Sequence, residues 1–147
     1  MKDIPAFISN YQSLDEVSIR FGWNDTDDSN WKFRTTVLEA VLADIDAAPV
    51  ILIRDLFRAE TRSAAHDWGF RDGVDVLGEQ LLRRGGIAYL DDFLEGKFAC
   101  FDTQAGVLTP RDEPLSTTML NEIRARLAAD PTSPKADLWR AGERLFD

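Results

Sequence analysis

Three closely spaced aspartates are the residues whose spacing most directly suggests metal chemistry. Asp25, Asp27 and Asp28 fall within one polar stretch, and neighbouring carboxylates can converge on a hard cation such as Ca²⁺. An EF-hand loop counted from Asp25 needs glycine at its sixth position, where this chain has Asn30, and the bidentate glutamate of the last position is also missing. We therefore predict no metal site here. Instead we expect Asp28 or Ser29 to cap the helix that follows.

The chain has one histidine and one cysteine, so zinc sites and catalytic nucleophiles have few candidates. His66 alone cannot supply a zinc site with several histidine ligands, and its neighbour Asp67 should point elsewhere because adjacent helix residues do not face each other. Cys100 lies between an alanine and a phenylalanine, a setting typical of a small buried apolar residue. We predict a packed or hydrogen-bonded histidine, no catalytic, cofactor-binding or metal-binding residue, and hence no enzyme.

An enzyme that depends on carboxylates or on a divalent metal is the alternative that these residues leave open. Asp91 and Asp92 are consecutive, so this pair spreads its side chains rather than focusing them on one bond. An inward metal site in a helical bundle would need carboxylates three or four positions apart on an apolar face. No such pair stands out in the sequence, so this alternative has no residues to assign to it.

Aromatic residues are interleaved with carboxylates in two separate stretches, and this is the strongest functional pattern in the sequence. Interface hot spots favour aromatic anchors, while surrounding carboxylates steer a basic partner and fix its register. The competing interpretation is that the rings belong to the core and that the acidic residues lie on the solvent-exposed faces of the same elements. If the two stretches fold side by side, they form one acidic face. The residues that we predict to bind a partner are Trp23, Asp25, Asp27, Asp28, Trp31, Tyr89, Asp91, Asp92, Glu95 and Asp102.

The charge balance favours a basic protein partner and argues against nucleic acids and membranes. The 147-residue chain carries a net charge of −9 and has a pI near 4.6, whereas duplex DNA and membrane surfaces require a basic footprint. We expect one domain over residues 1–147, because a chain of this length buries roughly 70% of its unfolded surface. A single cysteine indicates no dependence on oxidation, and the N-terminus has the pattern of neither a signal peptide nor a membrane anchor. The cytoplasm is the expected location.

A helical hairpin from Trp31 to Trp68 is the element around which we expect the other helices to pack. Its first helix places apolar residues at steps of three and four, which puts them on one stripe. Pro49 suits the first position of the second helix, since the N–H that it lacks is not needed there. The second helix begins apolar on all sides, so other elements must cover it. The apolar positions of the first helix are Phe33, Val37, Leu38, Val41, Leu42 and Ile45.

Further apolar periodicities predict a mainly α fold of about seven helices. One helix should follow a capping box at Ser13 and end near Gly22, although strict alternation over residues 17–37 also allows a small β-hairpin. Residues 97–108 are the least helical part, and there the pattern allows a small hairpin, an irregular loop or a helix. The other helices are expected near residues 74–85, 87–95, 116–130 and 134–146.

Three classes of function follow from these observations, and we favour the first. It is a non-enzymatic acidic protein-binding domain, for example an immunity or inhibitor protein that neutralises a basic partner such as a nuclease-like toxin. An active site that binds phosphates is basic, and a carboxylate-rich surface would compete for it. The second class is a structural subunit or homo-oligomer that buries surplus aromatic residues against a copy of itself. The third is the carboxylate- or metal-dependent enzyme. Partner identity and oligomeric state stay open.

Overall fold

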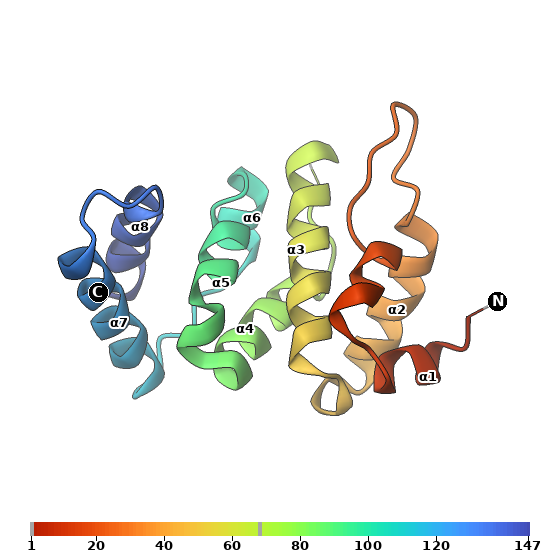
Figure 1. Cartoon of the computed structure of the whole chain (residues 1–147), viewed down its shortest axis with the longest axis horizontal. Coiled ribbons are helices and arrows are strands. Elements are labelled where there is room, and N and C mark those ends of the chain that lie inside the picture. Colours follow the sequence, from red (N-terminus) through yellow and green to blue (C-terminus); the bar gives the residue numbers. More distant parts are fainter. Residues whose placement is uncertain (1, 68) are drawn as a thin grey trace.

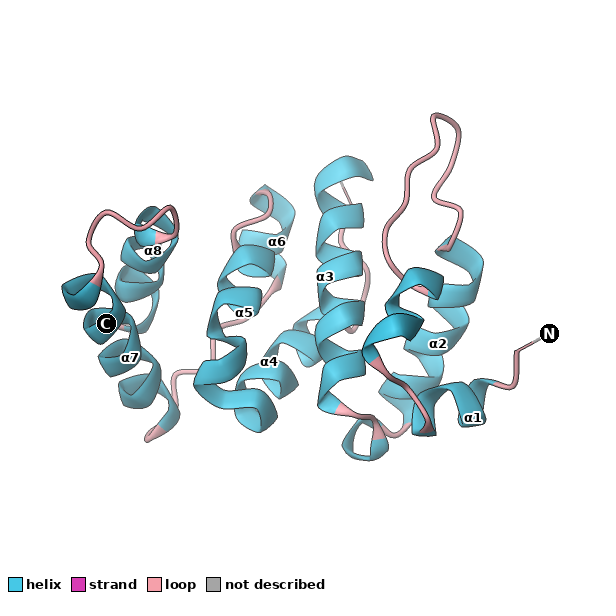
Figure 2. Ribbon diagram, in the orientation of Figure 1, coloured by secondary structure: helices cyan, strands magenta, loops and turns pink. Residues whose placement is uncertain are grey.

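Helices account for nearly all of the regular structure. A computed structural model describes residues 2–67 and 69–147, and its helices stand beside one another in a row (Figures 1 and 2). The mainly α prediction is confirmed, with eight α-helices and three short 3₁₀ segments in the described residues. None of these helices has both the length and the apolar composition needed to cross a bilayer. The elements are α1 (Ile4–Ser9), η1 (Ser13–Ser18), α2 (Trp31–Ala43), η2 (Ile45–Ala47), α3 (Val50–Asp67), α4 (Val74–Gly85), η3 (Gly86–Tyr89), α5 (Leu90–Lys97), α6 (Phe101–Gly106), α7 (Leu115–Ala129) and α8 (Ala136–Phe146).

The predicted hairpin is formed by α2 and α3. α2 runs toward the turn that contains η2, and α3 returns beside it in the opposite direction (Figure 1). Pro49 immediately precedes α3 instead of being its first residue. The apolar stripe of α2 is buried at Val37, Leu38 and Val41, as its spacing predicts. Trp68, the expected end of the hairpin, lies outside the described residues.

Most of the first half of α3 is buried, although Val50, Ile51 and Arg54 keep part of their surface exposed, so the helix is not covered on all sides as its apolar sequence predicted. Leu52, Ile53, Leu56 and Phe57 have no exposed surface, because α4 and α5 pack against this helix (Figure 1). Glycine allows the close approach of α5: a Cβ added at Gly96 would lie 2.2 Å from a ring carbon of Phe57. The core of the molecule therefore runs through α3.

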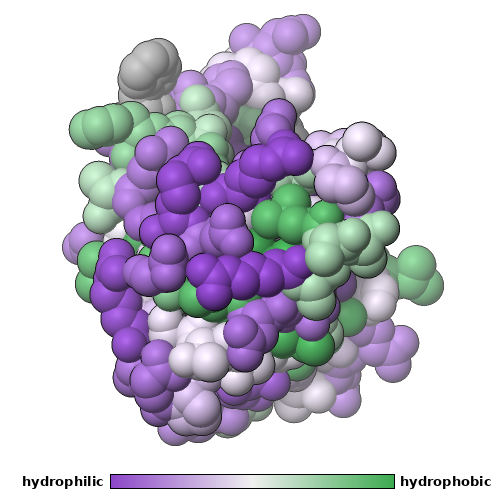
Figure 3. Space-filling view, turned by 90° about the vertical axis from the view of Figure 1, so that its left-hand side faces the viewer, coloured by the Kyte–Doolittle hydropathy of each residue, from purple (hydrophilic) through white to green (hydrophobic). Residues whose placement is uncertain are grey.

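A second helical hairpin, α7 and α8, lies at the opposite end of the row from α1 and α2 (Figure 1). Asp91 of α5 connects it to the other helices, accepting hydrogen bonds from Trp139 Nε1 at 2.8 Å and from Arg126 Nη1 at 2.9 Å. Lys135 Nζ lies 3.0 Å from the other carboxylate oxygen. The outer face at this end consists mostly of hydrophilic side chains, with separate apolar patches between them (Figure 3).

The β-hairpin allowed over residues 17–37 does not form. The described residues there contain only an isolated β-bridge between Trp23 and Asp28. Backbone carbonyls that a ladder would use are satisfied by side chains instead, and Asn30 Nδ2 donates to two of them at 3.1 and 3.0 Å. The helix expected to begin with a capping box at Ser13 and to end near Gly22 forms only as the 3₁₀ segment η1, which ends at Ser18 and has Gln12 as its N-cap. Side-chain hydrogen bonds therefore take the place of the ladder.

Residues 97–108 contain a short helix, α6, so the small hairpin allowed there does not form. Thr103 has no exposed surface, and its Oγ1 accepts a hydrogen bond from the backbone N–H of Cys100 at 3.0 Å. The ammonium of Lys97 donates to the carbonyl of Val107 at 2.5 Å. These buried polar contacts close the segment into a helical turn, because each satisfies a backbone group that a strand would have paired.

Candidate functional site

A loop over residues 22–30 carries the first acid-rich stretch and extends beyond the ends of the helices (Figure 2). Its conformation is ordered by Asn24, whose side-chain oxygen accepts hydrogen bonds from two backbone N–H groups of the loop at 3.2 and 3.1 Å. Trp23 and Trp31, at its two ends, are 44% and 45% exposed. The loop and the first residue of α2 thus present two large rings that the rest of the protein covers only in part.

Of the three aspartates in this loop, two face the solvent and one is buried. Asp25 and Asp27 are exposed, whereas Asp28 is 8% exposed and pairs with Arg34, which has no exposed surface. Burial by itself would raise the pKa of Asp28, but the hydrogen bond from Arg34 and those from backbone N–H groups outweigh it and hold that pKa below its usual value. Asp28 also forms no capping bond with α2, whose N-cap is Asn30. Instead, Asp28 accepts hydrogen bonds from the backbone N–H groups of Gly22 and Asn30 at the two ends of the loop.

A network of buried charges joins the loop to the hairpin. Arg34 donates through Nε to Glu60 Oε1 at 3.0 Å and through Nη1 to the carbonyl of Ile19 at 3.2 Å. Glu60 is 3% exposed, and its second oxygen lies 3.5 Å from Nε of Arg71, in the segment after α3. Because removing one member would leave a charge unpaired in the interior, the network holds the loop, α2 and α3 in one arrangement.

Arg71 stacks on the indole of Trp31. Its guanidinium carbon lies 3.8 Å from the ring centroid, and its Nη1 donates to Thr35 Oγ1 at 2.9 Å. Burial lowers the pKa of Arg71, but an arginine stays protonated in a protein. A cation–π contact therefore fixes the position of this ring, while nearly half of the side chain stays open to solvent.

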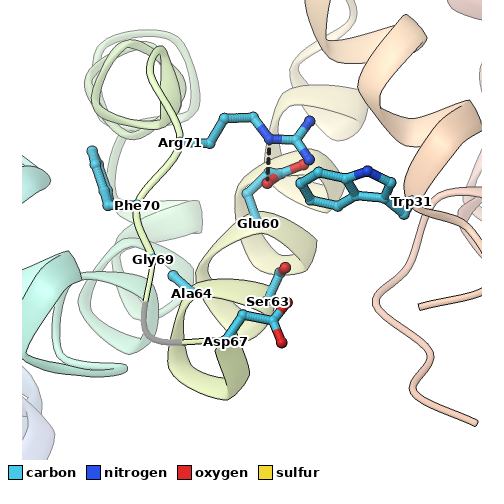
Figure 4. Close-up of a pocket in the computed structure, with 8 residues that line it drawn as sticks. All are labelled: Trp31, Glu60, Ser63, Ala64, Asp67, Gly69, Phe70 and Arg71. Atoms are coloured by element: carbon cyan, nitrogen blue, oxygen red, sulfur yellow. Dashed lines mark ion pairs between the residues drawn. The ribbon is translucent and has the colours of Figure 1, made fainter. Parts of the chain in front are cut away.

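Two adjoining hollows flank Trp31, and we call them together the tryptophan cleft. The hollow on the α3 side has a volume of about 270 Å³, and Figure 4 shows Arg71 and Glu60 paired beside the indole. The hollow on the loop side has a volume of about 450 Å³. Trp31 and Asp67 line both. The first is lined by Trp31, Glu60, Ser63, Ala64, Asp67, Gly69, Phe70 and Arg71, and the second by Trp23, Thr26, Asp27, Asp28, Ser29, Trp31, Lys32 and Asp67.

His66 and Asp67 do pair, contrary to the expectation that these neighbours point apart. Nδ1 of His66 lies 2.8 Å from Oδ1 of Asp67. Both belong to the exposed last turn of α3, where no following turn restricts the side chains, so they can bend toward each other. The imidazole packs between aromatic rings, with its centroid 4.3 Å from that of Trp23 and 5.4 Å from that of Phe21. The histidine is thus both packed and hydrogen-bonded, as predicted.

The second acid-rich stretch lies on the other side of α3 from the loop, so the two stretches do not form one acidic face (Figure 1). Asp91 is engaged in the contacts with α7 and α8 described above, and Asp92 lies 3.7 Å from Nε of Arg58. Burial raises the pKa of Asp92. The guanidinium of Arg54 lies over the ring of Tyr89, and its central carbon is 5.8 Å from the ring centroid. This stretch mainly joins helices to one another, and only Glu95 among its α5 carboxylates is exposed.

The aromatic rings of the second stretch divide between core and surface. Phe93 is fully buried, which fits the interpretation that these rings belong to the core. Phe101 is 81% exposed and borders an open hollow of about 360 Å³, lined also by Cys100 and Asp102. This hollow is mostly apolar and lies beside the C-terminal half of α3, where Ala64 lines both it and the α3 side of the tryptophan cleft.

The sequence did not point to the residues of α3 and of the segment after it that complete the cleft. They are Glu60, Ser63, Ala64, Asp67, Gly69, Phe70 and Arg71. The sequence does mark Arg34, the ion-pair partner of Glu60, as unusual. It precedes Val37 and Leu38 by three and four positions, so it lies on the apolar stripe of α2. A charged residue on such a stripe is buried only when it is paired. The pairing partner lies 26 positions further along the chain and carried no comparable signal.

The cleft is the best-supported site in the described residues. Nowhere in residues 2–67 and 69–147 are three histidine, cysteine, aspartate or glutamate side chains grouped so that they could hold a metal ion. Comparisons with protein-family models, curated proteins and solved structures found no match. We therefore infer function from the geometry and charge of the cleft.

Proposed function

We propose that this protein is a non-enzymatic binding domain whose tryptophan cleft binds a basic segment of a protein partner. The observation that carries the proposal is the pair of half-exposed indoles, Trp23 and Trp31, which line one hollow together with the carboxylates of Asp27 and Asp67. Tryptophan is enriched among the residues that supply most of the binding energy at interfaces. Carboxylates around such anchors select a partner of opposite charge.

The buried network beneath the cleft supports a binding role because it fixes the site before a partner arrives. Arg34 and Glu60 tie the loop to both helices of the hairpin, and Arg71 fixes Trp31. A preorganised surface loses less conformational freedom on association than a flexible one. The net charge of −9 adds long-range attraction for a basic protein.

An immunity or inhibitor protein is the specific form of this function that we propose. A nuclease-like toxin must have a basic surface where it binds phosphate groups, and an acidic cleft with aromatic anchors can occupy that surface in place of the nucleic acid. We also propose a cytoplasmic location, because a chain with one cysteine cannot depend on an internal disulfide.

Self-association is a second candidate function, favoured by the exposed Phe101. A side chain of this size that is 81% exposed loses its contact with water if a second copy covers the adjoining hollow. Sedimentation that shows a dimer at all protein concentrations would support a homo-oligomer, and a monomer would oppose it.

The partner proposal is tested with the purified chain as bait against an extract of its native host. Asp25→Lys/Asp27→Lys reverses two exposed charges of the loop. Asp130→Lys/Asp137→Lys, the matched control, reverses two exposed charges at the opposite end of the molecule and gives the same net charge. We expect the wild type and the control to retain one protein rich in lysine and arginine, and retention to weaken steeply as ionic strength rises.

The loop variant should lose this protein while keeping its melting temperature. Equal retention by the two double variants would contradict a role for the loop, and failure of the wild type to retain any basic protein would contradict the proposed function. A melting temperature raised by Mg²⁺, Mn²⁺ or Ca²⁺ would instead favour the metal-dependent enzyme.

A further inference from the structure

We infer that the loop-side hollow of the tryptophan cleft seats one arginine side chain of the partner, an inference that rests on the proposed function and specifies its ligand. The hollow combines two indoles, Trp23 and Trp31, with the carboxylates of Asp27 and Asp67. Aromatic faces attract cations, and carboxylates accept hydrogen bonds from them. A cationic side chain is the group that satisfies both parts of this lining.

The protein already binds one arginine in the same way on the other side of the cleft. Arg71 lies 3.8 Å from the centroid of the Trp31 ring, and its Nε lies 3.5 Å from a carboxylate oxygen of Glu60. The loop-side hollow presents the same combination of indole and carboxylate without an arginine of this chain in its lining. Because a guanidinium is planar, it can stack on a ring and donate to a carboxylate at the same time, which an ammonium does less well.

The charges around the hollow leave room for one more cation. Asp28 is neutralised by its pairing with Arg34 beneath the loop. Lys32 is the one cation in the lining, against the exposed carboxylates of Asp27 and Asp67. Asp67 is hydrogen-bonded to His66, which also packs against Trp23. The imidazole therefore holds the indole of Trp23 and the carboxylate of Asp67 in the lining of the loop-side hollow.

The test uses the full chain, ¹⁵N-labelled, titrated at pH 7.5 with three short peptides that differ in one side chain. They are acetyl-Gly-Arg-Gly-amide, its citrulline counterpart, which is nearly the same shape but uncharged, and its lysine counterpart. We expect the arginine peptide to shift the indole N–H signals of Trp23 and Trp31 in a saturable manner. The indole N–H of Trp139, which is hydrogen-bonded to Asp91, should not move. The lysine peptide should bind more weakly, and the citrulline peptide should cause no saturable shift.

Variants then assign the two carboxylates. Asp27→Asn and Asp67→Asn should each weaken binding of the arginine peptide by about threefold, the size typical of exposed ion pairs, and the control Asp137→Asn should leave it unchanged. Equal shifts with the citrulline peptide, or no shift at either indole, would overturn the inference. If the host partner is still captured through Asp25 and Asp27, the proposed function survives that failure. If the arginine peptide binds but no partner is captured, the proposed function fails instead.

Discussion

Arg34 of α2 and Glu60 of α3 form an ion pair with a nitrogen–oxygen distance of 3.0 Å, in which the side chains are 0% and 2% exposed. The same guanidinium pairs with Asp28. Arg34→Met would leave Asp28 in the interior without a cation and Glu60 with only the longer contact to Arg71 at 3.5 Å, so we expect the free energy of unfolding to fall by about 3–5 kcal/mol. Urea unfolding at pH 7 measures this change.

The control for this prediction is another arginine whose ion pair is exposed. Arg140 pairs with Asp137, and their side chains are 47% and 99% exposed. Arg140→Met should therefore change the free energy of unfolding by less than about 0.5 kcal/mol. Similar effects of the two substitutions would mean that the buried network does not hold the site together.

Asp91 should make the stability of the protein depend on pH in the acid range. Burial alone would raise its pKa, but hydrogen bonds from Trp139 and Lys135 outweigh this and hold the pKa below its usual value. A carboxylate whose folded-state pKa is depressed contributes stability above its unfolded pKa, near 4, and this stability is lost as the pH falls through the folded pKa.

The free energy of unfolding, measured from pH 6 to pH 2.5, should therefore fall less steeply for Asp91→Asn than for the wild type. An unchanged slope in Asp91→Asn would contradict the assignment.

Gly96 should tolerate no side chain, although alanine is the better helix former. In an exposed helix, glycine to alanine stabilises by about 1 kcal/mol. In α5 the added Cβ would lie 2.2 Å from a ring carbon of the fully buried Phe57, so we expect Gly96→Ala to lower the free energy of unfolding by about 1–3 kcal/mol. At Gly69 an added Cβ meets no atom within 4 Å, and Gly69→Ala should not destabilise. A neutral or stabilising Gly96→Ala would show that α5 packs less closely than described.

The sequence predicted most helices correctly because their apolar spacing is local. The stripe of Val37, Leu38 and Val41 identified α2 from within one segment, and its burial follows from that spacing. The site could be predicted only in part. Trp23 and Trp31, which the interleaved pattern singled out, are half-exposed beside carboxylates, whereas the burial of Asp28 depends on an arginine whose own environment is set by a distant helix.

Long-range arrangement is what the sequence could not supply. Both acid-rich stretches interleave aromatic residues with carboxylates, but α3 lies between them (Figure 1), and no local pattern specifies which helix separates two segments. The helix α6 was similarly ambiguous, because the contacts that close it, from Lys97 and Thr103, use side chains to satisfy backbone groups. Such contacts do not alter the apolar periodicity.

Trp23→Ala should remove partner binding while leaving the fold intact. Trp23 is 44% exposed and does not belong to the core cluster, so its loss leaves the core intact, and a central interface tryptophan contributes 2 kcal/mol or more to binding in typical cases. We expect the dissociation constant of the captured partner, measured by calorimetry, to rise by at least about thirtyfold. Phe101→Ala removes an even more exposed ring outside the cleft and should not change it. Equal losses in the two variants would place the interface elsewhere.

Photo-cross-linking in the native host tests most directly whether the tryptophan cleft is where a basic partner binds. A benzoylphenylalanine is placed at Thr26, which lines the loop-side hollow, or at Thr118, an exposed threonine on α7 at the far end of the molecule. We expect position 26 to form one adduct, with a protein rich in lysine and arginine, and position 118 to form none. An adduct from position 118 only, or an adduct at position 26 with a second copy of this chain, would contradict it.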